Sequence, residues 1–223
     1  MALAETTIIR FKNRLTKREI EFFRGAIIEV ASLGDSYLFH NHTETGFRNR
    51  YPLIQYKILN GRAALVGLGE GAQQLMQLRE MLDKGLHIGY KTLEFETSSV
   101  ERIETKVKMT VSPQQYLISD WLPLNQQNFR KYNAMRSSAN RHQLLEQVVV
   151  GNIFSFCKSL DYTLEDHLTC TIEETSPLRT VKYKGATLLE MDAVISANIN
   201  LPQYLGLGKG CSVGHGTISF AGF

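Results

Sequence analysis

The dipeptide Asn60-Gly61 constrains the fold of this chain more than any other feature of its sequence. It lies between two apolar runs, "PLIQYKIL" and "RAALVGLG", which have the length and composition of β-strands. Asn-Gly between such runs is the strongest short-range signal for a β-hairpin, because both residues tolerate the positive φ of a two-residue turn. We therefore expect two antiparallel strands joined at this dipeptide.

Amphipathic helices and further strands surround this hairpin. A strand-like run, "ETTIIRFKN", comes first, and a helix is predicted over residues 16–32, where Thr16 and Glu19 match a capping box. Apolar residues recur on one face of this helix at Ile20, Phe23, Ile27 and Val30. A second helix is predicted over residues 69–85, with Leu75, Leu78 and Leu82 on one face. Two runs that follow it, "YKTLEFETS" and "IETKVKMTV", look like a strand or a strand pair, which completes the order of a ferredoxin-like domain.

A second α+β unit is predicted after residue 111. The strand "QYLISDWLPL" precedes two helical stretches, at about residues 128–135 and 140–159. Three further strand-like runs follow, "HLTCTIEET", "TVKYKGATLLEMDAVISANI" and "TISFAGF". The sequence therefore predicts an α+β protein with one domain over residues 1–111 and another over residues 112–223.

Basic residues are concentrated in two places, although the net charge is only +3, from 25 basic and 22 acidic residues. The acid-free stretch "FRKYNAMRSSANRH" holds four of them, Arg130, Lys131, Arg136 and Arg141. A second cluster comprises Arg48, Arg50 and Lys57. Two local clusters on a nearly neutral chain indicate a polyanionic partner, with a solvated charged face as the alternative.

The cysteines and the apolar runs set the expected compartment. Cys157, Cys170 and Cys211 are odd in number and widely separated, which argues against a disulfide framework and against CxxC-type zinc sites. No apolar run approaches the roughly 20 residues of a membrane helix, and the first residues do not resemble a secretory signal. We expect a reduced, cytoplasmic protein that does not associate with membranes.

A glycine-rich stretch near the end of the chain, "YLGLGKGCSVGHGTI", contains five glycines within eleven positions. They are Gly206, Gly208, Gly210, Gly214 and Gly216. The spacing matches neither a Walker loop nor a dinucleotide-binding fingerprint. Because glycine permits positive φ and close backbone approach, the stretch predicts close contact either with a phosphate or with neighbouring protein backbone.

Two histidines, His40 and His42, lie close to the first basic cluster in "LFHNHTETGFRNRYPLIQYK". Three roles are open to them. A metal site would need further ligands, and the stretch offers only Glu44. A hydrogen-bonded core position is the second. Proton transfer is the third and is favoured, because imidazole titrates near neutral pH and the neighbouring Arg, Lys and Tyr residues suit phosphodiester chemistry.

The motifs, taken together, resemble a known family. "FHNH", "RYPLIQYK", "GLGEGA", "WLPLNQQNFRKY", "GNIFSFCK", "VKYKG" and "LPQYLGLGKGCSVGHGTI" are similar, in this order, to motifs of the CRISPR-associated repeat-RNA endoribonucleases, the sixth Cas family, in its b branch. The glycine-rich loop is the mark of the wider RAMP superfamily, whereas "FHNH" with "RYPLIQYK" marks the branch. The similar segments extend over most of the chain.

The resemblance implies two tandem ferredoxin-like (RRM-like) domains and a cut within the repeats of a CRISPR precursor transcript. The cut would need no metal or other cofactor and would leave a 2′,3′-cyclic phosphate and a 5′-hydroxyl. His40 and His42 would be catalytic, assisted by Tyr51. The family's loop usually ends in Ser, a basic residue, Gly, an aromatic residue and Gly. Here Val213 and His215 replace the basic and aromatic residues, so an RNA contact would shift to Lys209 and His215.

The predicted RNA-binding residues comprise both basic clusters and the loop. They are Arg48, Arg50, Lys57, Arg130, Lys131, Arg136, Arg141, Gly206, Gly208, Lys209, Gly210, Ser212, Gly214, His215 and Gly216. The predicted partner is CRISPR repeat RNA, and the sequence is compatible with a monomer or a homodimer. The alternative function is that of a non-catalytic RNA-binding RAMP subunit, which would have other subunits of a CRISPR effector complex as partners.

Overall fold

The structure is a computed structural model, and it describes all residues except 33–41, 44–45, 48–50, 83–85, 89–90, 94, 165–166 and 222–223. The chain divides into two compact units. The N-terminal unit consists of residues 3–105 and 212–214, and the C-terminal unit consists of residues 1–2, 106–211 and 215–223. The predicted division after residue 111 falls inside strand β9 (Met109–Trp121).

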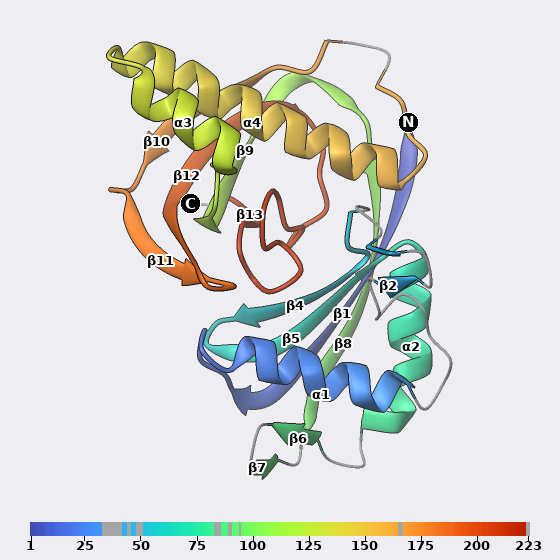
Figure 1. Cartoon of the computed structure of the whole chain (residues 1–223). Helices are drawn as coiled ribbons and strands as arrows, with labels where there is room; N and C mark the ends of the chain where they lie inside the picture. Colours follow the sequence, from blue (N-terminus) through green and yellow to red (C-terminus); the bar gives the residue numbers. More distant parts are fainter. Residues whose placement is uncertain are drawn as a thin grey trace. The chain divides into compact units, whose positions relative to one another are not determined.

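The N-terminal unit is a four-stranded sheet with two helices on one face (Figure 1). The strand order, β4-β5-β1-β8, is that of a ferredoxin-like fold. Short β2–β3 and β6–β7 pairs form separate ribbons. The elements are β1 (Ala2–Arg14), α1 (Ile20–Ser32), β2 (His42–Thr43), β3 (Gly46–Phe47), β4 (Ile54–Leu59), β5 (Arg62–Leu68), α2 (Glu70–Leu82), β6 (Leu86–Ile88), β7 (Lys91–Leu93) and β8 (Thr97–Val107).

The predicted hairpin at Asn60-Gly61 is confirmed. Strands β4 and β5 pair antiparallel, with Leu59 opposite Arg62 across the turn. Asn60 and Gly61 have φ values of 52° and 73°, the left-handed pair that a type I′ turn requires. This turn fixes the register of the two strands and therefore which β4 side chains face the helices.

Helix α1 begins at Ile20 and not at the predicted residue 16. The backbone N–H of Thr16 donates to the Glu19 carboxylate at 2.9 Å, which is one half of the predicted capping box. The Thr16 hydroxyl also donates to that carboxylate, at 2.6 Å. No helical N–H of the described residues donates to this hydroxyl, and the regular helix starts one turn later.

An aromatic cluster forms the core between the helices and the sheet. Phe23 of α1 contacts the rings of Phe11, Tyr56 and Phe95 at centroid distances of 5.8, 6.1 and 5.2 Å. All four rings are buried. Burial raises the pKa of the Tyr56 phenol well above its usual value of 10. The Tyr56 side chain therefore lies on the face of β4 that packs against α1. The side chains of its two neighbours in the strand lie on the opposite face of the sheet.

Of the two alternatives predicted after the second helix, a strand or a strand pair, the N-terminal sheet has the single strand. Residues 97–107 form one strand, β8, which pairs with β1 in the N-terminal sheet. The next strand, β9, belongs to the C-terminal sheet. Strands β8 and β9 thus join different sheets, because the one residue between them, Lys108, is too short a connection to close a hairpin.

The C-terminal unit repeats the ferredoxin-like strand order with one helix missing. Its five-stranded sheet has the order β10-β12-β9-β13, with β11 also paired to β12. Residues 200–216, between β12 and β13, form no helix where the fold would have its second helix. The elements are β9 (Met109–Trp121), α3 (Gln126–Ala134), α4 (Ser138–Ser159), β10 (Cys170–Thr175), β11 (Arg179–Tyr183), β12 (Ala186–Ile199) and β13 (Thr217–Phe220). The prediction of two tandem ferredoxin-like domains is confirmed.

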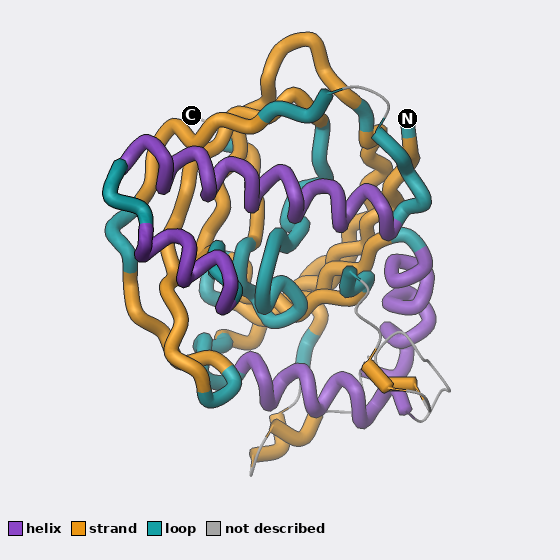
Figure 2. Tube along the Cα trace, turned by 45° about the horizontal axis from the view of Figure 1, so that its top comes forward, coloured by secondary structure: helices purple, strands orange, loops and turns teal. Residues whose placement is uncertain are grey.

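Helices α3 and α4 lie across one face of the C-terminal sheet (Figure 2). Asn125 caps α3 by accepting the Asn128 N–H at 2.8 Å, and Ser137 caps α4 by accepting the Asn140 N–H at 3.4 Å. Helix α4 buries one side, whereas α3 buries no residue. Since α3 contributes nothing to the core, its polar surface is left for another role. No helix in the described ranges is long and apolar enough to cross a membrane.

Candidate functional site

The predicted catalytic segment lies partly beyond what the structure describes. His40, Arg48 and Arg50 are outside the described residues. The backbone of His42 belongs to β2, where it pairs with Phe47 of β3, and its side chain is not among those described. The roles predicted for these four residues therefore stay predictions.

Tyr51 lies in the segment that leads into β4. Its hydroxyl oxygen accepts a hydrogen bond from Gln55 Nε2 at 2.8 Å, and the same amide group donates to the Pro52 carbonyl at 3.1 Å. Gln55 is fully buried and Tyr51 is half-buried. Gln55 therefore fixes the direction of the Tyr51 phenol. Tyr51 would need such a fixed direction to orient a substrate or a histidine.

Lys57 is fully buried in β4, at 0% exposure. It alternates with Tyr56, so it points to the sheet face opposite α1. An RNA phosphate cannot reach an enclosed ammonium group, so this burial contradicts the prediction that Lys57 binds RNA. The sequence suggested an exposed cation because Lys57 follows two nearby arginines, whereas the strand periodicity places it inside.

Helix α3 and the turn after it present exposed cations. Arg130, Lys131 and Arg136 are exposed and form no ion pair with any described residue. Phe129, on the same helix, is 42% exposed. We call Arg130, Lys131 and Arg136 the α3 cation patch. Unpaired cations beside an exposed ring are the groups that contact phosphates and bases of single-stranded nucleic acid.

Arg141, predicted as a fourth member of this cluster, has a structural role in the described chain. Its Nε donates to the carbonyls of Tyr132 at 3.2 Å and Met135 at 3.0 Å, at the end of α3. Its guanidinium also lies over the Tyr132 ring, 5.0 Å from the centroid. Because Arg141 belongs to α4, these contacts tie the end of α3 to α4; the Tyr132 carbonyl also accepts the Met135 N–H at 3.3 Å. They use Nε of the guanidinium and hold the Arg141 side chain against the end of α3.

The glycine-rich stretch folds against its own backbone. Gly208, Gly210, Gly214 and Gly216 all have positive φ. A Cβ on Gly216 would come within 1.9 Å of the Leu207 carbonyl oxygen, and one on Gly210 within 2.8 Å of the His215 ring. Leu207 N–H donates to the Gly216 carbonyl at 2.7 Å. The sequence predicted that these glycines contact either a phosphate or neighbouring protein backbone. In the described structure they closely approach protein atoms.

Two members of the stretch occupy distinct surroundings. Lys209 is exposed, with its Nζ 5.9 Å from the Tyr183 ring centroid. Ser212 belongs to the N-terminal unit, where its carbonyl accepts the Tyr56 N–H at 2.8 Å. Lys209 is thus the described cation of this stretch that an RNA phosphate could approach.

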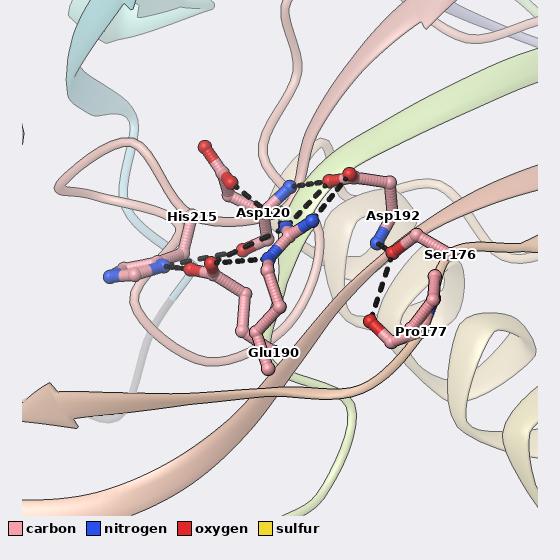
Figure 3. A network of polar contacts seen from close by, with 7 residues as sticks. Asp120, Ser176, Pro177, Glu190, Asp192 and His215 are labelled. Atoms are coloured by element: carbon pink, nitrogen blue, oxygen red, sulfur yellow. Dashed lines mark hydrogen bonds and ion pairs between the residues drawn. The ribbon is translucent and has the colours of Figure 1, made fainter.

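A polar network that the sequence did not predict surrounds His215 (Figure 3). His215 Nδ1 lies 3.1 Å from Glu190 Oε2 and 3.2 Å from the Asp120 carbonyl oxygen. Arg179 lies opposite Glu190 in the β11–β12 pair, and its guanidinium contacts Glu190 at 3.4 Å, Asp192 at 2.9 Å and Asp120 at 3.2 Å. Glu190 and Asp192 are two residues apart on β12, so their side chains lie on the same face of the sheet. This spacing is the only feature of the sequence that points to the network.

The network is strongly acidic for a partly enclosed site. Glu190 is 2% exposed, and one guanidinium serves three carboxylates. Hydrogen bonding to Asp192 and the field of the three acids raise the pKa of Arg179 above its already high value. Arg179 therefore stays charged and holds the network together at any ordinary pH.

The side chains of the described part of the chain form no cluster of metal ligands. No group of three or more His, Cys, Asp or Glu side chains there has an arrangement that could hold a metal ion. The acidic residues of the His215 network are instead directed at Arg179.

Comparisons with known proteins identify the family. The Cas6b N-terminal domain model matches residues 1–106, and the Cas6b C-terminal domain model matches residues 108–220. The uncharacterized protein MJ0978 of Methanocaldococcus jannaschii is 33% identical over 148 residues, which cover 65% of this chain and 94% of that protein.

Solved structures agree with the family models. A crystal structure of Cas6b superimposes with a TM-score of 0.86 at 29% identity, covering 98% of this chain and 100% of the other. A crystal structure of the CRISPR RNA processing endoribonuclease Cas6b has a TM-score of 0.76 at 25% identity, covering 99% and 100%. Both units of the chain are matched, and the chain therefore belongs to the Cas6b family.

Proposed function

We propose that this protein is an endoribonuclease that cuts CRISPR precursor RNA within its repeats, without a metal ion. One observation carries the proposal: both Cas6b domain models match, over nearly the whole chain. The full-length similarity to a protein described as a CRISPR RNA processing endoribonuclease supports it. The exposed α3 cation patch supports binding of a polyanion.

The proposed reaction uses the RNA's own 2′-hydroxyl as nucleophile. One of His40 and His42 takes the proton of this hydroxyl, whose oxygen attacks the adjacent phosphorus. The other histidine protonates the departing 5′-oxygen, so the products are a 2′,3′-cyclic phosphate and a 5′-hydroxyl. Each such proton transfer contributes roughly 10²–10⁴-fold to the rate. Tyr51, held by Gln55, would orient a histidine or the phosphate.

The proposed binding groups lie in the C-terminal unit. The α3 cation patch would contact the RNA backbone and position the strand without reading its sequence. Lys209 would contact a further phosphate from the glycine-rich stretch. Arg141 is assigned to the fold and Lys57 to the interior, so neither belongs to the proposed RNA surface.

The test is cleavage of an RNA that carries the CRISPR repeat, in the presence of EDTA. We expect the wild type to cut, and His40→Ala/His42→Ala to bind but not cut. A substrate with a single 2′-deoxy nucleotide at the cut should also resist cleavage. His167→Ala removes an exposed histidine outside the proposed site and should cut normally.

Each other outcome has a definite meaning. Binding by the wild type without any cleavage would favour the non-catalytic RNA-binding subunit. Cleavage that requires a divalent metal, or that survives loss of both histidines, would refute the proposed chemistry. Cleavage of the 2′-deoxy substrate would exclude the 2′-hydroxyl as nucleophile.

A further inference from the structure

The two ring nitrogens of His215 have different surroundings. Nδ1 faces two oxygens, Glu190 Oε2 at 3.1 Å and the Asp120 carbonyl oxygen at 3.2 Å. A carbonyl can only accept a hydrogen bond, so the proton of the neutral ring belongs on Nδ1. The other nitrogen, Nε2, then carries a lone pair and acts as an acceptor.

Nε2 is open to a ligand. It has no hydrogen-bond partner among the described residues, and it is not one of their fully enclosed polar atoms without a partner. The His215 side chain is 17% exposed. Figure 3 shows the second ring nitrogen pointing away from Glu190 and Asp120. One edge of the imidazole is thus fixed inside the unit and the other faces outward.

The ring is held rigidly by its neighbours. Tyr183 meets it edge-on, with centroids 5.4 Å apart and an interplanar angle of 90°. Gly210 packs so closely that a Cβ there would lie 2.8 Å from Cδ2 of the imidazole. Glu190, which orients Nδ1, is itself nearly buried and contacts Arg179 on the adjacent strand. A ring fixed in this way loses little entropy when it binds a ligand.

An accessible Nε2 lone pair can bind a ligand group that donates a hydrogen bond. Exposed Lys209 and His215 both contact the Tyr183 ring, which places an ammonium suited to a phosphate near the imidazole. Next to a phosphate, the sugar of RNA offers one donor, its 2′-hydroxyl, which DNA lacks.

We propose that Nε2 of His215 accepts a hydrogen bond from one ribose 2′-hydroxyl of the bound repeat RNA, and that Glu190 is the positioning residue that fixes this tautomer. The proposal rests on the proposed function, because it requires repeat RNA as the ligand. It adds a recognition role that is distinct from proton transfer at the cut.

The experiment measures affinity for an uncleavable repeat RNA, with a 2′-deoxy nucleotide at the cut, as further single 2′-deoxy substitutions are introduced along it. We expect one position where removal of the hydroxyl weakens binding to the wild type by about 3–10-fold, the range for a single hydrogen bond. The same removal should have no effect on His215→Phe, which keeps a planar ring. Glu190→Gln should reduce this position-specific effect, whereas the exposed control Glu174→Gln should keep it.

A spectroscopic measurement separates this role from a purely structural one. Long-range ¹H–¹⁵N spectra of the imidazoles, assigned with His215→Phe, should show the Nδ1–H tautomer of His215 in the wild type at pH 8. Glu190→Gln should produce a mixture of tautomers, because the amide can donate as well as accept. Repeat RNA should shift the Nε2 resonance of the wild type.

The outcomes distinguish this proposal from the proposed function. If the wild type binds repeat RNA but no 2′-hydroxyl is coupled to His215, only the present inference fails. A uniform loss of affinity in His215→Phe for all RNAs, or an Nε2–H tautomer in the wild type, would also overturn it. If the wild type does not bind repeat RNA at all, both proposals fail.

Discussion

Gly216 illustrates how a single residue determines the glycine-rich stretch. Its φ is +62°, and a Cβ would collide with the Leu207 carbonyl oxygen at 1.9 Å. The glycines were expected from the sequence to allow close approach, but the sequence did not say whether to a phosphate or to protein. That choice depends on the Leu207–Gly216 hydrogen bond, which joins the two sides of the stretch.

Gly216→Ala should destabilise the C-terminal unit by about 3 kcal/mol or more, because the backbone must move as well as adopt a strained φ. Gly185→Ala is the matched control, since Gly185 also has positive φ (+77°) but nothing within 4 Å of a Cβ. The control should cost about 1–2 kcal/mol from the left-handed conformation alone. Urea unfolding can be followed by the fluorescence of the single tryptophan, buried Trp121. Equal losses in both variants would contradict the clash.

The buried phenol of Tyr116 should make the stability of the protein depend on pH in the alkaline range. Its hydroxyl donates to the Ile199 carbonyl at 2.9 Å and accepts the Leu201 N–H at 3.0 Å. Burial raises the pKa of Tyr116 from 10 to about 12. Because the unfolded chain ionises first as pH rises, stability should fall between pH 10 and pH 12, by up to about 1.4 kcal/mol per pH unit for one proton.

Tyr116→Phe should remove that part of the alkaline loss while lowering stability at pH 7 by about 1–3 kcal/mol, since two buried backbone groups lose their partner. The measurement is the urea midpoint from pH 8 to pH 11.5 for both proteins. Tyr56 keeps its own contribution in both, because its pKa is also raised by burial. Parallel curves would show that the Tyr116 phenol does not resist ionisation.

The sequence predicts the helices and turns that have strong local signals. It predicts less well which strands pair with one another. The Asn60-Gly61 turn and the helices α2, α3 and α4 follow from turn chemistry and apolar spacing, and the structure confirms them. The sheet membership of β8 does not follow, because pairing with β1 is a contact between distant residues. The His215 network was missed for the same reason: Asp120, Arg179 and Glu190 come from three strands.

The two arginines of α3 and α4 should separate stability from binding. Arg141→Gln removes the hydrogen bonds to Tyr132 and Met135, and should lower the free energy of unfolding by about 1–2 kcal/mol. Arg130→Gln, on an exposed face, should change it by less than about 0.5 kcal/mol but should weaken RNA binding. Unfolding and binding of the uncleavable RNA are measured for both. The reverse pattern would show that Arg141 faces the RNA.

At the scale of the whole molecule, the distribution of charge matters more than its sum. A net charge of +3 would not by itself draw a polyanion to a chain of 223 residues. Many cations of the N-terminal sheet are already paired, as Arg10 is with Glu101 and Arg102 with Glu5. The α3 cation patch is different because its members are exposed and form no ion pair among the described residues. These cations lie in an acid-free run of the sequence, which leaves them no local acidic partner, and their contact with RNA stays a prediction.

Salt dependence tests whether that patch contacts RNA phosphates. For single-stranded nucleic acid, the logarithm of the binding constant falls with the logarithm of salt concentration by about 0.7 per phosphate neutralised. Replacing Arg130, Lys131 and Arg136 by Gln should therefore reduce the slope by up to about 2, if each contacts one phosphate. Lys12→Gln and Lys182→Gln remove cations that already contact Glu96 and Thr187, and together should leave the slope unchanged. Binding of the uncleavable RNA is measured between 50 and 300 mM salt, roughly the range in which counterion release dominates. A triple variant with an unaltered slope would mean that the α3 cation patch does not contact RNA phosphates, whatever its affinity at one salt concentration.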